Sequence, residues 1–78
     1  MDIKILGPGC NNCKTLEQRT RTALQELGLD AAIEKVTDYP SILAHGATST
    51  PGLVVNGRLL IAGRVPTLSE IKEAILGA

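Results

Sequence analysis

The sequence has almost no aromatic residues: one tyrosine, no tryptophan and no phenylalanine among 78 residues. It therefore lacks the side chains on which nucleobases stack. It also lacks an excess of charge of either sign, because eight basic residues balance eight acidic residues that are scattered singly along the chain. Without a basic patch, we expect neither nucleic acid nor an anionic membrane surface as a partner.

Long apolar runs are also missing, and no segment reaches the length that is needed to cross a membrane. The segment Met1–Leu6 is too short and wrongly flanked to fit a signal peptide. We therefore expect a cytoplasmic protein with no membrane partner. The length predicts a single domain over residues 1–78, near the smallest size at which one core is sufficient, and we expect a monomer.

Cysteine is scarce too, but its placement is the most informative feature of the chain. Cys10 and Cys13 are the only two cysteines, and they follow the apolar residues Ile3–Leu6 within the motif GPGCNNC, which spans residues 7–13. In a cytoplasmic protein, two close cysteines are more often catalytic or metal-binding than structural. Residues three apart on a helix have Cβ atoms about 5–6 Å from each other, close enough to form a disulfide after a modest adjustment.

The pattern after the motif places Cys10 at the start of a helix and Cys13 one turn inside it. Unpaired amides and the positive end of the helix dipole favour an anion at the first position, where a thiolate can accept a hydrogen bond from the Cys13 amide. We therefore predict that Cys10 is the nucleophile, with a lowered pKa. Cys13, which is less exposed, is the predicted resolving thiol.

The rest of the chain predicts an alternating order of strands and helices. After the strand Ile3–Leu6, the pattern favours a helix from Cys10 to Gly28, a strand over 30–36 and a short helix from Asp38 to Gly46. Two strands over 53–55 and 58–61 flank Asn56-Gly57, the dipeptide that best fits a type I′ turn. A closing helix begins after Thr67, which forms a capping box with Glu70. The predicted inward-facing helix residues are Leu16, Ala23, Leu24, Leu27, Ile42, Leu43, Leu68, Ile71, Ile75 and Leu76.

This order predicts an α/β fold with a mixed sheet. A strand, a helix and a second strand favour a right-handed parallel unit, and the hairpin extends the sheet with antiparallel strands. Helices must then cover both faces of the sheet. The cysteine pair follows the carboxyl end of the first strand, which is where open α/β sheets place their functional sites.

Two motifs make the chain resemble a minimal thioredoxin-fold protein of the small glutaredoxin-sized family of redox-active disulfide proteins. They are residues 7–13 and the segment STPGLVVNG over residues 49–57. The resemblance implies a thioredoxin fold with a four-stranded mixed sheet and helices on both faces. It also implies a thiol–disulfide oxidoreductase without a cofactor, which takes a disulfide-containing substrate and is served by an upstream reductase or thiol donor.

The same resemblance implies a cis bond between Thr50 and Pro51, with the proline facing the cysteines. The Thr50 backbone, exposed by the turn at Pro51, is then expected to pair with an extended substrate segment. Gly63 is expected to let a substrate backbone approach closely. The residues between the cysteines, Asn11 and Asn12, differ from the Gly-Pro of thioredoxins and the Pro-Tyr of glutaredoxins, so a redox potential does not carry over from either family.

Two other classes of function remain open at this point. A soft-metal module for copper or zinc would use the same two thiolates, but His45 is the only other obvious ligand, and Pro8 stands where such modules usually place methionine. Those modules also place a hairpin directly after the first helix, whereas this chain predicts a second helix before its hairpin. A non-catalytic interaction domain is the other alternative. We expect no metal site.

Overall fold

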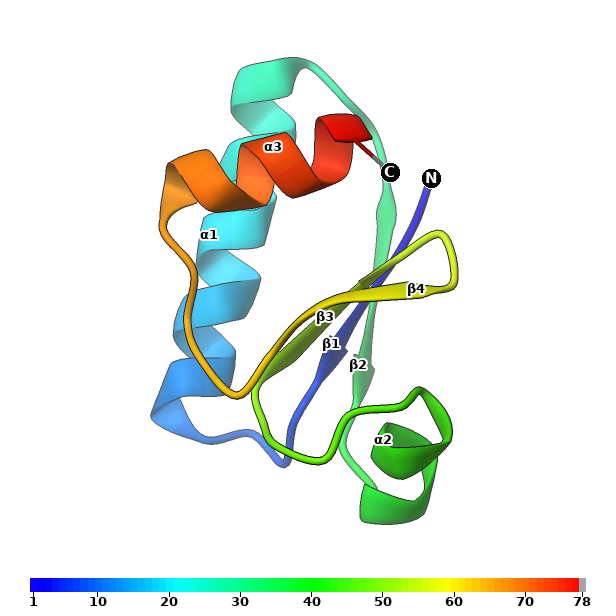
Figure 1. Ribbon diagram of the computed structural model, residues 1–78. Helices are drawn as coiled ribbons and strands as arrows, with labels where there is room; N and C mark the ends of the chain where they lie inside the picture. Colours follow the sequence, from blue (N-terminus) through cyan, green and yellow to red (C-terminus); the bar gives the residue numbers. More distant parts are fainter. Residues whose placement is uncertain (78) are drawn as a thin grey trace.

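The computed structural model of the protein describes residues 1–77. Strands and helices follow each other in the predicted order, and Figure 1 shows how they are arranged. No helix within residues 1–77 is long and apolar enough to cross a membrane. The elements are β1 (Asp2–Leu6), α1 (Asn11–Leu27), β2 (Ala32–Val36), α2 (Tyr39–Ala44), β3 (Gly52–Val55), β4 (Arg58–Ala62) and α3 (Leu68–Gly77).

The four strands form one mixed sheet in the order β2-β1-β3-β4. β1 pairs with β2 in parallel and with β3 antiparallel, so that Ile5 lies between Lys35 of β2 and Leu53 of β3. β3 and β4 form the predicted hairpin, in which Asn56 and Gly57 have φ angles of 51° and 83°. Positive φ at both central residues is what a type I′ turn requires. The mixed sheet that the sequence predicts is therefore confirmed.

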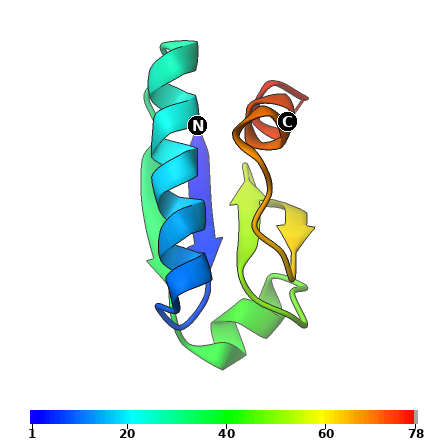
Figure 2. The same ribbon diagram turned by 90° about the vertical axis from the view of Figure 1, so that its left-hand side faces the viewer.

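The helices cover both faces of the sheet, as predicted. Alternating residues of a strand point to opposite faces, so Ile3 and Ile5 join the larger core beneath α1 and α3. Leu6 packs on the other face with Ile42 of α2 and Val54 of β3. In Figure 2, α1 lies in front of β1 and β2, and α3 lies beside α1.

Helix α1 begins and ends at the predicted residues. Cys10 is its N-cap, with an extended backbone, and Gly28 is its C-cap in the left-handed conformation with φ of 68°. Leu16, Ala23 and Leu24 are buried, as is Thr20, whose hydroxyl donates to the Leu16 carbonyl oxygen. The helix therefore holds its first turn, and with it Cys13, against the end of the sheet.

Two predicted core positions are wrong. Leu43 is 59% exposed and Leu76 is 67% exposed, although both were expected to point inward. Each directly follows a buried residue, Ile42 or Ile75. Consecutive residues of a helix, at 3.6 per turn, point about 100° apart, and each of these helices turns only a narrow side toward the sheet. The apolar neighbour of the buried residue therefore faces outward.

The second strand is shorter than predicted. It begins at Ala32 rather than at residue 30, because its parallel partner β1 begins at Asp2 and the pairing starts with Asp2 opposite Ala32. Strand β2 forms one edge of the sheet. Lys35 is exposed there, as the sequence predicts for an edge strand.

Candidate functional site

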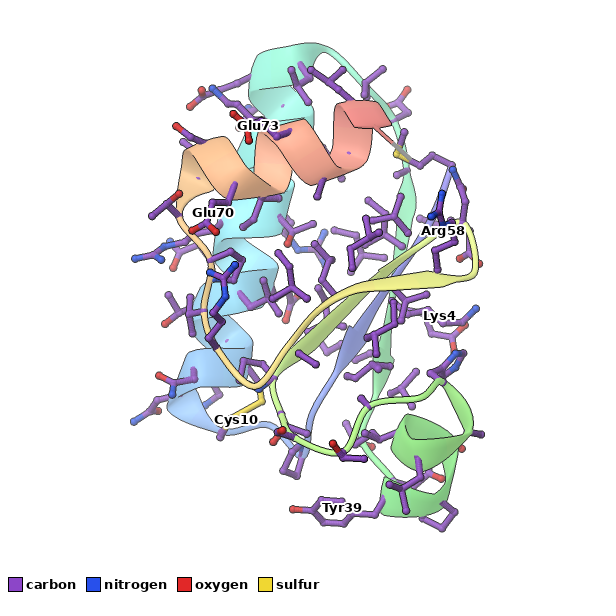
Figure 3. The ribbon with its side chains drawn as sticks, viewed as in Figure 1. Lys4, Cys10, Tyr39, Arg58, Glu70 and Glu73 are labelled. Atoms are coloured by element: carbon purple, nitrogen blue, oxygen red, sulfur yellow. A yellow bond between two sulfur atoms is a disulfide. The ribbon has the colours of Figure 1, made fainter. Side chains whose placement is uncertain are left out.

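The two cysteines lie where β1 passes into α1, and their sulfurs form a disulfide with the Cα atoms 5.1 Å apart. The loop over residues 7–9 turns the chain, and Gly9 has a φ of 90° that favours glycine. Figure 3 shows Cys10 at the end of the molecule where α1 begins. The predicted approach of the two thiols at the start of a helix is confirmed.

The surroundings of the two sulfurs differ. Cys10 is exposed, whereas Cys13 is only 5% exposed. The backbone N–H of Cys13 donates to Cys10 Sγ over 3.2 Å, in the position where a capping oxygen usually accepts. An accepting atom at a helix N-terminus is favoured as an anion by the free amides and the helix dipole. The exposed sulfur therefore lies at the end of the helix that favours an anion.

The Thr50-Pro51 peptide bond is cis, as the resemblance implied, and Pro51 is buried. Thr50 lies close to the cysteine loop: a Cβ added at Gly7 would be 3.9 Å from Thr50 Cβ and 3.3 Å from Cys13 Cβ. Thr50 and Cys13 therefore both border the space in front of the Gly7 Cα. The segment before β3 is brought to the same end of the molecule as the disulfide.

Gly63 also belongs to this region. Its N–H donates to the Pro51 carbonyl oxygen over 2.9 Å, which joins the end of β4 to the cis proline. Its φ is 82°, and an added Cβ would lie 3.2 Å from both Cβ and Oγ of Ser49. Gly63 thus packs closely against the segment that contains Thr50.

The segment after Gly63 is fixed in two further ways. Arg19 of α1 donates to the carbonyl oxygen of Pro66 over 2.9 Å. Arg64 forms a salt bridge with Glu70 of α3 over 2.7 Å. The connection between β4 and α3 is therefore attached to both helices that cover this face of the sheet.

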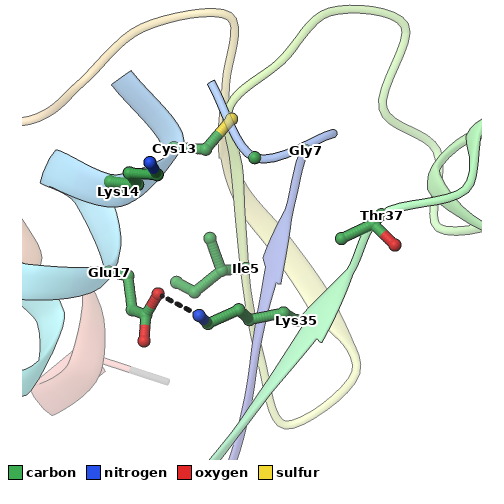
Figure 4. Close-up of a pocket in the computed structure, with 8 residues that line it drawn as sticks. Ile5, Gly7, Cys13, Lys14, Glu17, Lys35 and Thr37 are labelled. Carbon is green, nitrogen blue, oxygen red and sulfur yellow. Dashed lines mark ion pairs between the residues drawn. The ribbon is translucent and has the colours of Figure 1, made fainter. Parts of the chain in front are cut away.

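A small cavity of about 70 Å³, which was not predicted from the sequence, lies beside Cys13. Figure 4 shows Glu17 of α1 and Lys35 of β2 paired across it. Their charged atoms are 3.0 Å apart. The hydrogen bond from Lys35, reinforced by one from Arg21, holds the pKa of Glu17 below its ordinary value of 4.5. The lining residues are Ile5, Gly7, Gly9, Cys13, Lys14, Glu17, Lys35 and Thr37.

Only part of this cavity was accessible to sequence reasoning. Glu17 follows Cys13 by four residues, which places both on one face of α1. Lys35 is added only by the parallel pairing that sets it beside Ile5. Gly7, which lies against Cys13, was predicted from the sequence only as a residue that ends the strand.

A metal ion at this site would need ligands besides the two cysteines. Within residues 1–77, no three His, Cys, Asp or Glu side chains are grouped so that they could hold a metal ion. His45, the other possible ligand in the sequence, is the C-cap of α2. Nothing in this arrangement adds a third ligand to the two cysteines.

A four-stranded mixed sheet with helices on both faces, a Cys-x-x-Cys disulfide at the start of α1 and a cis proline before β3 define a small thioredoxin-fold redox protein. A family model described as "Thioredoxin domain" matches residues 1–76, and the chain belongs to this family. It is a thiol–disulfide oxidoreductase that exchanges electrons through its Cys-x-x-Cys pair.

Two similar proteins are both named thioredoxin. The one from Methanothermobacter thermautotrophicus is 48% identical over 75 residues, which cover 96% of this chain and 97% of that protein. The one from Methanocaldococcus jannaschii is 38% identical over 73 residues, which cover 94% of this chain and 84% of that protein. The similarity thus extends over nearly the whole chain.

Proposed function

We propose that Cys10 is the attacking thiol and Cys13 the resolving thiol of this oxidoreductase. The observation that supports these roles is the contrast between the two sulfurs: Cys10 is exposed and accepts the N–H of Cys13, whereas Cys13 is buried. The thiolate is the nucleophilic form of cysteine. A substrate disulfide can reach Cys10 directly, whereas the buried Cys13 sulfur is placed to react with Cys10 Sγ.

In the first step, the Cys10 thiolate attacks one sulfur of the substrate disulfide. The substrate S–S bond breaks, a mixed disulfide forms, and the other substrate sulfur leaves as a thiolate that takes up a proton. In the second step, Cys13 loses its proton to solvent and attacks Cys10 Sγ. The mixed disulfide breaks, the second substrate thiolate leaves, and the Cys10–Cys13 disulfide remains. Two electrons have then passed to the substrate.

Thr50, Pro51 and Gly63 are proposed to hold the substrate. Within residues 1–77, no hydrogen bond uses the Thr50 backbone, whose N–H and C=O can therefore pair with an extended segment. The Gly63 N–H is already bonded to Pro51, so Gly63 contributes by its small size rather than as a donor. Backbone pairing of this kind gives affinity with little selection among side chains.

The proposed partners are disulfide-containing substrates and an upstream reductase or thiol donor that returns the disulfide to the dithiol. We place the protein in the cytoplasm as a monomer of one domain over residues 1–78. These assignments rest on the balanced charge, on the lack of aromatic residues and on the likeness to two proteins named thioredoxin.

The roles of the cysteines are tested by single substitutions in an assay that follows reduction of an exposed disulfide in a model protein. With a dithiol reductant, the wild-type protein accelerates the reduction and Cys10→Ser abolishes the effect. Cys13→Ser instead accumulates a mixed disulfide through Cys10, because the attacking thiol remains and the resolving thiol is gone.

A mixed disulfide trapped through Cys13 in the Cys10→Ser variant would reverse the proposed roles. The soft-metal alternative is tested on the same preparations. If the reduced wild-type protein keeps one zinc or copper ion per chain after a moderate chelator, and neither variant alters turnover, the redox roles proposed for the two cysteines are wrong.

A further inference from the structure

Gly7 is a glycine whose backbone conformation does not require glycine. Five other glycines have φ between 68° and 92°, where residues with a Cβ are strained, but Gly7 is not among them. Its surroundings nevertheless leave no room for a side chain. A Cβ added at Gly7 would overlap with Cys13 Sγ and lie 3.3 Å from Cys13 Cβ. The need for glycine at this position therefore comes from the sulfur of Cys13.

The other two glycines with ordinary φ show that this contact is specific. A Cβ added at Gly77 would have no atom of another residue within 4 Å. One added at Gly52 would lie 3.3 Å from Leu6 Cδ1 and 3.4 Å from the Ile61 carbonyl oxygen, contacts that are tight but do not overlap. Only at Gly7 would the added carbon occupy the position of a reacting atom.

Gly7 cannot easily give way. It is buried, and its N–H donates to the Val36 carbonyl oxygen over 2.8 Å, which continues the pairing of β1 with β2 beyond Leu6. The added Cβ would also lie 3.9 Å from Thr50 Cβ, so that Thr50 and Cys13 both border the space in front of the Gly7 Cα. Relief of a clash at position 7 must therefore come from movement of Cys13 Sγ.

Whether that sulfur can move depends on the redox state. In the disulfide, Cys13 Sγ is bonded to Cys10 Sγ and cannot change its rotamer without breaking the bond. In the dithiol, the Cys13 side chain is free to turn about χ1 to another staggered position. A side chain at position 7 therefore disfavours the disulfide much more than the dithiol.

We propose that Gly7 is a positioning residue for Cys13, and that the empty space at its Cα sets the balance between disulfide and dithiol. This inference rests on the proposed role of Cys13 as the resolving thiol. Gly7, which precedes Cys10 in the loop, would thus influence the reduction potential of the disulfide independently of Asn11 and Asn12, the two residues between the cysteines.

The test is Gly7→Ala, with Gly77→Ala as the matched control, in buffers of glutathione and glutathione disulfide. On oxidation, two protein thiols form one S–S bond, the S–S bond of glutathione disulfide breaks, and two electrons and two protons pass to give two glutathione thiols. Overpacking of a filled site predicts that Gly7→Ala shifts this equilibrium toward the dithiol by about tenfold or more. Tenfold is equivalent to about 30 mV for a two-electron couple.

Gly77→Ala should give the wild-type equilibrium. An unchanged equilibrium for Gly7→Ala, beside a wild-type protein that cycles normally, would overturn the role of Gly7 alone. A wild-type protein that forms no disulfide in any of the buffers would instead overturn the proposed roles of the cysteines.

A double-substitution cycle tests the contact itself. In Cys13→Ala the sulfur is absent and only the 3.3 Å contact with Cβ remains, so adding Gly7→Ala should lower the urea midpoint of this parent much less than it lowers that of the oxidised wild-type protein. The same comparison remains decisive if Gly7→Ala alone fails to fold, since the double variant should then fold. If Gly7→Ala is as harmful without the sulfur as with it, position 7 serves the backbone and the proposal fails.

Discussion

At the scale of single residues, Cys10 and Cys13 are the same chemical group in two environments. One sulfur is exposed at the N-cap and the other is buried under the first turn of the helix. In the reduced protein at neutral pH, a small alkylating agent should modify Cys10 at least about tenfold faster than Cys13. Mass spectrometry of peptides after timed quenching measures both rates. Equal rates would show that the helix N-terminus does not distinguish the thiols.

Gly63 offers a second test at this scale, because its conformation and its contacts can be separated. Gly63 and Gly57 have φ of 82° and 83°, but an added Cβ would approach Ser49 only at Gly63. Gly63→Ala and Gly57→Ala should both lose about 1 kcal/mol or more from backbone strain. Gly63→Ala should lose about 1–3 kcal/mol beyond that from the contact with Ser49. Urea unfolding of both variants measures the difference.

The rate of disulfide reduction distinguishes Gly63→Ala from Gly57→Ala in a second way. Gly57 lies in the hairpin turn, so Gly57→Ala should keep the wild-type rate of disulfide reduction once the protein is folded. Gly63→Ala should slow the rate, because the displaced segment carries Thr50. Equal rates for the two variants would remove Gly63 from the proposed substrate site.

At the scale of elements, the start of α3 carries the strongest electrostatic signal of the chain. Glu70 accepts hydrogen bonds from Arg64 and from the N–H of Thr67, which lower its pKa from 4.5 to about 2. A carboxyl group with a lowered pKa in the folded state stabilises the protein above pH 4.5. That contribution is lost as the pH falls from about 4.5 through about 2.

Glu70→Gln should therefore flatten the acid side of the stability profile. Glutamine still accepts from the Thr67 N–H, so the cap remains and only the charge is removed. We expect the stability of the variant to fall less steeply between pH 4.5 and pH 2 than that of the wild type. Glu73→Gln, on the same helix and without an ion pair among residues 1–77, is the control (Figure 3). Urea midpoints across this range decide the matter.

Elements whose signals are local were predictable. The turn at Asn56 and Gly57 and the caps at Cys10 and Gly28 depend on a few neighbouring residues, and all four have the expected conformations. The mixed character of the sheet, with a parallel first unit and an antiparallel hairpin, followed from the connections between the strands. The outward positions of Leu43 and Leu76 were missed, since an apolar pair such as Ile42-Leu43 does not reveal which member faces the core.

The parts of the site that depend on contacts distant in sequence were not predictable. The overlap between a side chain at Gly7 and Cys13 Sγ depends on the packing of α1 against the end of β1. The pairing of Glu17 with Lys35 depends on the register of the two parallel strands. Thr50 was placed near the cysteines by family resemblance, and no local pattern pointed to it.

At the scale of the whole molecule, the core rather than the disulfide should hold the fold. The cysteines are three residues apart, and so short a loop contributes about 2 kcal/mol in the chain-entropy account. Ile71 of α3 is fully buried in the larger core, and Ile71→Ala should lower the free energy of unfolding by about 2–5 kcal/mol. Reduction should therefore lower stability less than Ile71→Ala does, and leave the circular dichroism spectrum folded. Unfolding on reduction alone would contradict this.

The position of β1 in the sheet has a consequence for how the molecule is made. β1 is the first strand to leave the ribosome, yet it lies between β2 and β3, which end at Val36 and Val55. Contacts between distant segments form only after the intervening chain is available. The cysteines are thus synthesised early and enclosed late. Until Thr50 and β3 emerge, a nascent chain presents both thiols to solvent without the later segments that complete the packing around Cys13.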